Sequence, residues 1–131
     1  MTLDEHVAAC TLYGEARGEP LEGQQAVAHV LWNRVADGRW GPNLHAVCQA
    51  HAQFSCWLHS DPNYQKLTAL TDDNPELNTL LGVLQHAETQ PDFTQGAMWY
   101  VADSLTDKPS WIVAMEYCGH WGRQTFYREK I

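Results

Sequence analysis

A short junction between two helical patterns is the feature that most constrains the fold of this chain. Residues 13–20 read YGEARGEP, and they separate two stretches in which apolar residues recur at helical spacing. Glycine permits a positive φ and a close backbone approach, and Gly18 together with Pro20 opposes continuation of a helix. A carboxylate held at such a turn is partly desolvated, which raises its pKa towards the range of a general acid. The segment therefore predicts two helices that meet at a turn carrying a candidate acid/base residue.

The patterns on either side of the junction define the two helices. Thr2 and Glu5 form the capping-box pattern, so we expect the first helix to begin there and to end between residues 14 and 18. The second helix is predicted over about residues 21–35, where one stripe is apolar, and Asp37-Gly38 ends it.

Shorter signals predict further helical structure. Residues 43–47 fit a short helix, and Asn74-Pro75 is typical of a helix start, with Asn as the N-cap and Pro in the first turn. Leucines at positions 77, 80, 81 and 84 then give an amphipathic stripe. Residues 53–57 and 61–63 read as irregular or extended chain.

The C-terminal part of the chain predicts a small β element. Glycines and aromatic residues over 115–127 favour a hairpin, whereas the apolar run 96–102 fits a helix or a strand equally well. Without internal repeats or a linker in its 131 residues, the chain has the length of one domain. We therefore predict a single compact domain over residues 1–131, mainly α within the α+β class, with a small β-hairpin.

Charge and hydropathy argue against several classes of function. The net charge of −8, from 16 acidic and 8 basic side chains, is opposite to what sequence-independent nucleic-acid binding requires. Apolar runs fall far short of the roughly 20 residues of a membrane-spanning helix. Residues 1–17 are acidic and lack the apolar run of a secretory leader. We expect a monomer that is made in the cytoplasm, does not insert into membranes and has no nucleic-acid partner.

Cysteines and histidines are side chains of this sequence that could ligate a transition metal. Cys10, Cys48, Cys56 and Cys118 are most simply free thiols, although the spacing leaves a Cys48–Cys56 bridge open. Residues 45–59 place Cys and His at separations compatible with zinc, but they contain no CxxC or HExxH motif. We expect a short helix with surface histidines and thiols in this region, and neither a metal nor a cofactor.

Several segments of the chain resemble the SleB-type cell-wall hydrolases, a family that includes spore-cortex-lytic proteins and phage endolysins. The resemblance is strongest over 13–20 and 22–35, and it continues at 53–55, at 92–97 with Tyr100, at Trp111, and at Gly122 with Phe126 and Tyr127. It spans about residues 3–127 and implies a lysozyme-like fold. It also implies cleavage of peptidoglycan glycan strands between N-acetylmuramic acid and N-acetylglucosamine. The sequence departs from the family at Phe93, where proline is common, and at Gln124, where histidine is common.

The resemblance and the chemistry of the side chains together give a set of expected site residues. Glu15 is expected to be the catalytic acid/base. Residues expected to bind substrate are Gln53, Phe54, Ser55, Trp99, Tyr100 and Tyr13. Residues expected to support the site are Glu19, Arg17, Asn33 and Arg34. Of the neighbours Trp99 and Tyr100, one is expected in the core and Tyr100 in the groove. Glu19 is expected to pair with Arg17 or Arg34, and Arg34 with Glu19 or Glu22.

The number of carboxylates decides between the reactions considered. A glycoside hydrolase usually needs two carboxylates, whereas a lytic transglycosylase manages with one because a substrate hydroxyl replaces water. With Glu15 as the one well-placed carboxylate, we favour a lytic transglycosylase, acting as a phage endolysin that reaches the wall after release from the host cytoplasm. Three alternatives stay open: a muramidase using Glu19 or Asp103 as second carboxylate, an N-acetylmuramoyl-L-alanine amidase, and a non-catalytic peptidoglycan-binding module.

Overall fold

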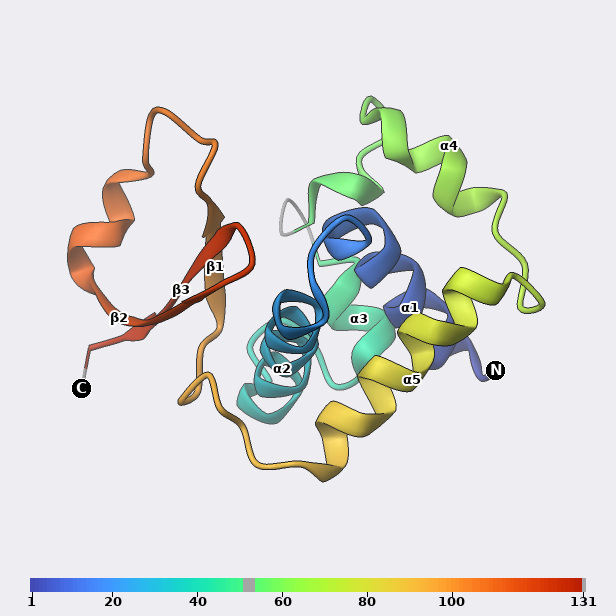
Figure 1. The fold of residues 1–131 in the computed structure, drawn as a ribbon, viewed down its shortest axis with the longest axis horizontal. Helices are drawn as coiled ribbons and strands as arrows, with labels where there is room; N and C mark the ends of the chain where they lie inside the picture. The colour runs from blue at the N-terminus through green and yellow to red at the C-terminus, as the bar shows by residue number, and fades with distance from the viewer. Residues whose placement is uncertain (51–53, 131) are drawn as a thin grey trace.

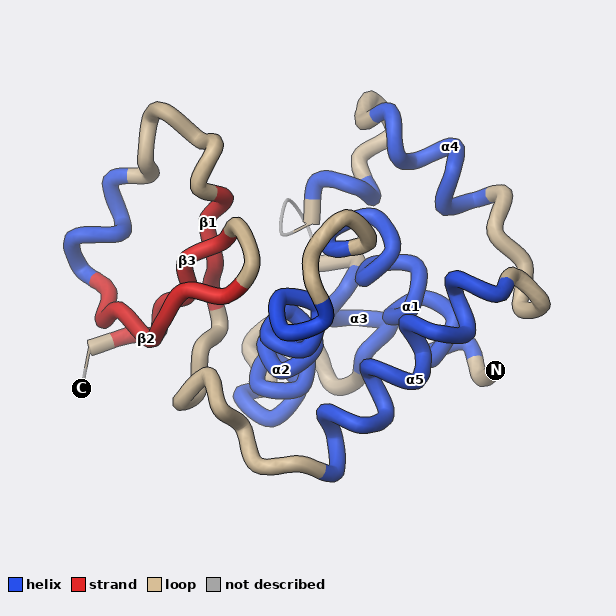
Figure 2. Tube along the Cα trace, in the orientation of Figure 1, coloured by secondary structure: helices blue, strands red, loops and turns tan. Residues whose placement is uncertain are grey.

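Helices form one part of the molecule and a three-stranded antiparallel sheet forms the other (Figures 1 and 2). The computed structural model describes residues 1–50 and 54–130. The sheet lies beside α2, and the N-terminus lies on the far side of the helices from the C-terminus (Figure 1). This arrangement confirms the predicted fold class.

The α-helices come first along the chain and the strands follow. The helices are α1 (Leu3–Ala16), α2 (Leu21–Asp37), α3 (Leu44–Cys48), α4 (Pro62–Thr68) and α5 (Pro75–Thr89). Two short 3₁₀ helices are η1 (Ser55–Trp57) and η2 (Ser110–Ala114). The strands are β1 (Trp99–Ala102), β2 (Met115–Trp121) and β3 (Gln124–Glu129).

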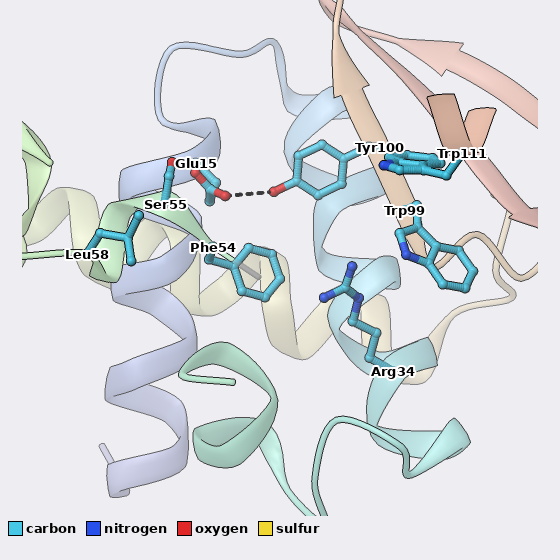
Figure 3. A pocket seen from close by; sticks show the side chains of 8 residues that line it. All are labelled: Glu15, Arg34, Phe54, Ser55, Leu58, Trp99, Tyr100 and Trp111. Carbon is cyan, nitrogen blue, oxygen red and sulfur yellow. Dashed lines mark hydrogen bonds between the residues drawn. The ribbon is translucent and has the colours of Figure 1, made fainter. Parts of the chain in front are cut away.

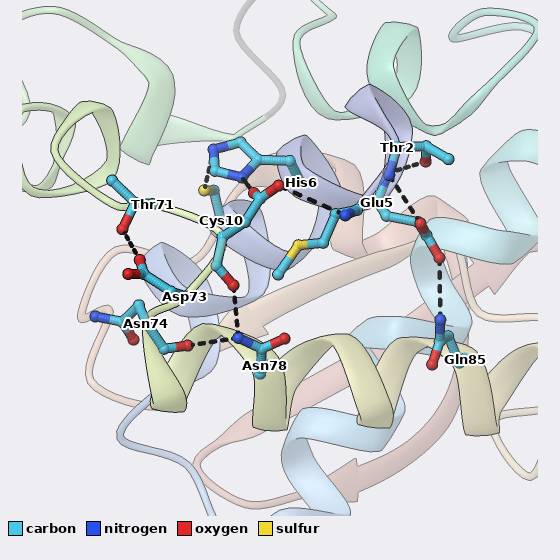
Figure 4. Close-up of polar contacts among 11 residues, drawn as sticks. Thr2, Glu5, His6, Cys10, Thr71, Asp73, Asn74, Asn78 and Gln85 are labelled. Atoms are coloured by element: carbon cyan, nitrogen blue, oxygen red, sulfur yellow. Dashed lines mark hydrogen bonds and ion pairs between the residues drawn. The ribbon is translucent and has the colours of Figure 1, made fainter.

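Side-chain caps fix the starts of α1 and α5 where the sequence predicts them. Thr2 Oγ1 accepts a hydrogen bond from Glu5 N at 3.1 Å, and Glu5 Oε1 accepts one from Thr2 N at 2.9 Å (Figure 4). Asn74 Oδ1 accepts from Leu77 N at 3.0 Å. Glu5 Oε2 also accepts from Gln85 Nε2 at 3.0 Å, which ties the start of α1 to α5 (Figure 4).

Helix α4 begins where irregular chain was expected. Asp61 caps it by accepting a hydrogen bond from Asn63 N at 2.8 Å, and Pro62 lies in its first turn. The same Asx-Pro start signal occurs at Asn74-Pro75. Because Leu67 is the buried residue of α4, however, the sequence shows no apolar stripe that would indicate a helix here. The expectation for residues 61–63 was therefore wrong.

The core lies among α1, α2 and α5. Small side chains allow the helices to approach closely, since Ala8, Ala9, Ala26 and Ala28 are fully buried. The predicted leucine stripe of α5 faces this core at positions 77, 80 and 84, while Leu81 is half-buried. No helix within residues 1–50 and 54–130 is long and apolar enough to cross a membrane.

The sheet has the order β1-β3-β2, so the predicted hairpin of β2 and β3 gains β1 as a third strand. Strand β1 resolves the ambiguity over 96–102 in favour of a strand for Trp99–Ala102. In the antiparallel register Tyr100 pairs with Phe126, and Phe126 is fully buried. Paired residues project from the same face of a sheet. Tyr100 therefore points towards the helices together with Phe126.

Gly14 allows η1 to pack directly against α1. A Cβ at this position would lie 2.6 Å from Cys56 Cβ and 2.9 Å from Cys56 Sγ. The close approach brings residues 54–58 beside Glu15, the next residue of α1.

We predict that Gly14→Ala lowers the free energy of unfolding by about 1–3 kcal/mol, because the added methyl overpacks this contact. Gly82→Ala is the matched control, since Gly82 also lies in a helix but has open space at its Cβ position. The control is expected to raise stability by roughly 0.5–1 kcal/mol. Urea unfolding of both variants provides the measurement, and stabilisation by both would contradict the packing of η1 on Gly14.

Candidate active site

A groove lies between the C-terminal end of α1, η1 and strand β1, with a volume of about 460 Å³. Figure 3 shows its walls, with Glu15 on one side and the rings of β1 on the other. The lining residues are Glu15, Arg34, Phe54, Ser55, Leu58, Trp99, Tyr100 and Trp111. Aromatic side chains therefore form much of the wall, and Glu15 is the lining carboxylate among the residues that the structure describes.

The carboxyl group of Glu15 is held in a partly dehydrated position. It lies one residue before the end of α1, and its Oε1 accepts a hydrogen bond from the Tyr100 hydroxyl at 3.1 Å (Figure 3). Burial raises the pKa of Glu15 from its ordinary 4.5 to about 6, against the opposing hydrogen bond from Tyr100. The charge of Asp61 raises this pKa further and that of Arg34 lowers it. A carboxyl group with this pKa exchanges protons readily near neutral pH.

Tyr100 acts as a hydrogen-bond donor to Glu15. Burial, reinforced by the nearby charge of Glu15, raises the pKa of Tyr100 well above 10, so the phenol stays protonated. Its ring packs on that of Phe126, with 5.4 Å between ring centroids. The sheet therefore fixes the direction from which Glu15 receives its hydrogen bond.

Arg34 places a buried cation beside the groove. The residue is only 3% exposed, and its Nε donates to the Met98 carbonyl at 2.8 Å. Its guanidinium lies 4.4 Å from the centroid of the Trp40 ring and 5.1 Å from that of Phe54. Burial lowers the pKa of Arg34 to about 10, which leaves it protonated at neutral pH. The expected ties to Glu19 or Glu22 were wrong. Glu22 lies 12 residues earlier on α2, about 18 Å away at 1.5 Å per residue, and Glu19 precedes the helix and binds Arg123.

Asn33 works with Arg34 to anchor the chain that leads into β1. Its Nδ2 donates to Asp92 Oδ2 at 2.8 Å and to the Ala97 carbonyl at 2.9 Å. Arg34 binds the very next carbonyl, that of Met98. These hydrogen bonds from the end of α2 fix the position of the chain where β1 begins, and therefore the position of Tyr100 in that strand.

Glu19 joins the turn between α1 and α2 to the β2–β3 hairpin. Its side chain is 7% exposed, and its Oε2 lies 2.8 Å from Arg123 Nη2. Its Oε1 accepts from the Arg123 backbone N–H at 2.9 Å. Gly122, with φ of +63°, lets the hairpin turn pass close by, since a Cβ there would lie 3.1 Å from Glu19 Oε1. The partner of Glu19 is therefore Arg123 rather than the expected Arg17 or Arg34.

Arg17 and Tyr13 contact each other at the end of α1. Arg17 Nη2 donates to Asn63 Oδ1 at 3.0 Å, and the guanidinium lies 4.6 Å from the centroid of the Tyr13 ring. Arg17 therefore ties α1 to α4. Among the described residues, Tyr13 does not line the groove, and its role in substrate binding stays a prediction.

The structure brings most of the other expected residues into the groove wall. Phe54 and Ser55 line it, whereas Gln53 lies outside the described residues. Trp99 and Tyr100 both line it and both are half-buried, so the expectation that one would be core was wrong.

Sequence reasoning missed two groove residues. Trp111 was noted in the resemblance but not assigned to the site, and its place in that pattern was the available signal. Leu58 carried no signal, because a lone leucine in an irregular segment has no periodicity to interpret.

Acidic residues outside the groove carry much of the net charge. Asp103, one candidate for a second carboxylate, lies in the turn after β1, where its Oδ2 is 2.6 Å from His120 Nε2. The four cysteines are free and buried, so the expectation of surface thiols within residues 45–59 was wrong. Among residues 1–50 and 54–130 no group of three or more His, Cys, Asp or Glu side chains is placed to hold a metal ion.

The fold and the groove define a helical domain with a candidate acid/base site against a small sheet. A sequence model of the cell wall hydrolase family matches residues 18–127. The chain therefore belongs to the cell wall hydrolase family. The matched span begins just after Glu15.

Two solved structures resemble the whole chain. One is the catalytic domain of the germination-specific lytic transglycosylase SleB from Bacillus anthracis. The TM-score is 0.77 and the identity 26%, over 98% of this chain and 96% of that one. The other is the catalytic domain of the Bacillus cereus SleB protein. It also gives a TM-score of 0.77 and 26% identity, over 95% of this chain and 89% of that one.

A curated relative matches in part. A spore cortex-lytic enzyme of Oceanobacillus iheyensis is 37% identical over 75 residues, which cover 53% of this chain. The matched region spans about a quarter of that protein's length, 26%.

We predict that Glu15→Gln makes the fold more stable at neutral pH. The folded pKa of about 6 lies above the ordinary 4.5, so the wild type loses stability as the pH rises through this interval and the glutamine variant does not. The free energy of unfolding of the variant minus that of the wild type is measured at pH 4 and at pH 7.5. We expect this difference to be about 1–2 kcal/mol more favourable to the variant at pH 7.5. Urea unfolding across this pH range measures the change. A difference that is constant with pH would contradict a raised pKa.

Proposed function

We propose that this chain cleaves the glycan strands of peptidoglycan, with Glu15 as the catalytic acid/base. The observation that carries the proposal is a carboxyl group with a raised pKa in a groove walled by aromatic rings. Flat rings pack against the apolar faces of sugars, and a carboxyl group that is protonated near neutral pH supplies a proton to a glycosidic oxygen. Membership of the cell wall hydrolase family and likeness to a lytic transglycosylase domain support the same substrate.

The bond cleaved is that between N-acetylmuramic acid and N-acetylglucosamine. Protonated Glu15 donates its proton to the glycosidic oxygen as the bond from C1 of the muramic residue to that oxygen breaks. The resulting Glu15 carboxylate accepts the proton of the muramic C6 hydroxyl, whose oxygen bonds to C1 and closes a 1,6-anhydro ring. The proton count balances and Glu15 ends protonated again, so no water is consumed.

The contacts of Glu15 suit both halves of this cycle. Tyr100 donates to Oε1 at 3.1 Å, which steadies the carboxylate after the proton has left. Arg34 adds a fixed positive charge that favours the same state. Burial acts in the opposite direction and favours proton uptake. Because these effects oppose one another, the pKa of Glu15 is about 6, and the carboxyl group can both donate and accept a proton near neutral pH.

Glu19 and Asp103 are poor candidates for the second carboxylate of a muramidase. Glu19 is bound to Arg123, and Asp103 to His120. Within the described part of the chain, neither lines the groove. This favours the transglycosylase reaction over a hydrolysis that needs two carboxylates across the bond.

The biological setting proposed is that of a phage endolysin, a monomer made in the host cytoplasm that acts on the wall after release. This finer assignment stays a prediction. Expression in a bacterial host with and without permeabilisation of the inner membrane tests it: lysis that depends on permeabilisation supports the endolysin role, and lysis of germinating spores alone would contradict it.

We predict that Glu15→Gln lowers the release of soluble muropeptides from purified peptidoglycan by at least about a hundredfold, because it removes the proton donor and acceptor. Asp107→Asn is the control, since Asp107 is exposed in the loop after β1 and should keep full activity. Circular dichroism of both variants checks that the fold is retained.

Mass spectrometry of the wild-type products distinguishes the reactions. 1,6-Anhydromuramic ends are the expected result. Reducing muramic ends would show hydrolysis, and cleaved lactyl–alanine bonds would show an amidase. Binding without any release would show a non-catalytic module, and full activity of Glu15→Gln would remove Glu15 from the mechanism.

A further inference from the structure

A second aromatic surface lies at the edge of the sheet opposite the catalytic groove. It is an open hollow of about 600 Å³ lined by Leu21, Glu22, Gln25, Phe93 and Trp121, here called the Phe93 surface. We propose that it is a second binding site for the neutral glycan strand of peptidoglycan, distinct from the site of cleavage. The inference rests on the proposed function, because it assigns the same polymer to both sites.

Phe93 is an exposed ring held in a fixed position. It is 38% exposed, and it packs edge-to-face on His29 and on Trp121, with 5.2 Å between ring centroids in each pair. The preceding residue, Asp92, is anchored by Asn33 and by the backbone N–H groups of Thr94 and Gly96. A large apolar ring on the surface that is already ordered loses little conformational entropy when a ligand stacks on it.

Strand β2 places the ring of Trp121 in the Phe93 surface as well. A register shift between Tyr117 and Gly119 forms a bulge in β2 just before this residue, and bulges redirect the side chains beside them. The ring of Trp121 then lies across Gly119, where a Cβ would come within 2.3 Å of the indole. Glycine at 119 is therefore what permits this position of the ring.

The polar residues of the Phe93 surface fit hydroxyl and amide groups. Glu22 and Gln25 lie three residues apart on α2, so they project from one side of the helix. A carboxylate accepts hydrogen bonds from sugar hydroxyls, and the carboxamide both donates and accepts them, as an N-acetyl group requires. The described lining residues include a carboxylate but no cation, which disfavours the anionic peptide stems and favours the uncharged glycan.

A continuous series of rings joins the two sites. Trp121 lies 5.5 Å from Phe126, and Phe126 lies 5.4 Å from Tyr100, which donates to Glu15. The strand order β1-β3-β2 places Tyr100 on one edge strand and Trp121 on the other. Both sites therefore belong to one rigid sheet, and binding at the Phe93 surface holds the groove near the polymer.

The test uses insoluble peptidoglycan stripped of other wall polymers, with Glu15→Gln as background so that binding is measured without digestion. The double change Leu21→Ser with Phe93→Ser is expected to lower the bound fraction in sedimentation at least fivefold. Tyr117→Ser with Val113→Ser is the matched control, because both residues are exposed apolar side chains outside both sites. This control should bind as the parent does.

In the active background, the Phe93-surface variant should release products from insoluble peptidoglycan more slowly and should cleave a soluble tetrasaccharide at the parental rate. Melting temperatures near the parent's exclude misfolding, and Gln25→Ala, which is milder, should weaken binding in the same direction. Unchanged sedimentation, or an equal loss on the tetrasaccharide, would overturn the second site. Failure of the parent to cleave either substrate would instead overturn the proposed function.

Discussion

Burial of the Glu15 carboxyl group between the end of α1 and strand β1 is the constraint on which the rest of the structure depends. Removing a carboxylate from water is unfavourable, and here it raises the pKa of Glu15 to about 6. The fold limits that cost with one hydrogen bond from Tyr100 and the charge of Arg34. A group left with no such contacts would stay protonated, and a fully solvated one would lose its proton at acidic pH.

Helix α2 holds the sheet, and with it Tyr100, in position beside the carboxyl group of Glu15. Near its C-terminal end Asn33 and Arg34 donate hydrogen bonds to the carbonyls of Ala97 and Met98, the two residues that precede β1. Before its N-terminal end Glu19 binds Arg123 of the hairpin turn. The sheet is thus attached at both ends of one helix, and Tyr100 lies between the two attachments. These attachments at the two ends of α2 position the Tyr100 hydroxyl for its hydrogen bond to Glu15.

Local signals in the sequence predicted the parts of the fold that depend on neighbouring residues. Capping residues gave the starts of α1 and α5, and the glycine-rich segment 13–20 gave the junction and Glu15. The same rules missed α4, because its apolar periodicity is too short to detect, although Asp61-Pro62 carries a start signal. Strand β1 was ambiguous until its pairing with β3 was known, since an apolar run fits either state.

Contacts between distant residues were the harder part of the site. Glu19 was expected to pair with Arg17 or Arg34, yet its partner Arg123 lies 104 residues away, and nothing local indicates that pairing. Trp111 and Leu58 reach the groove only because η2 and η1 fold back towards it. The groove places the positive charge of Arg34 near enough to Glu15 to lower its pKa, and its other described lining residues are uncharged.

The state of Glu15 in the resting protein tests this account most directly. Carbon-detected NMR of selectively labelled glutamate follows the Glu15 carboxyl resonance across a pH titration of the wild type, with Glu15→Gln to assign the signal. The account predicts a midpoint of about 6. A midpoint at the ordinary value of 4.5 would show a solvated carboxylate at neutral pH and would contradict Glu15 as the proton donor.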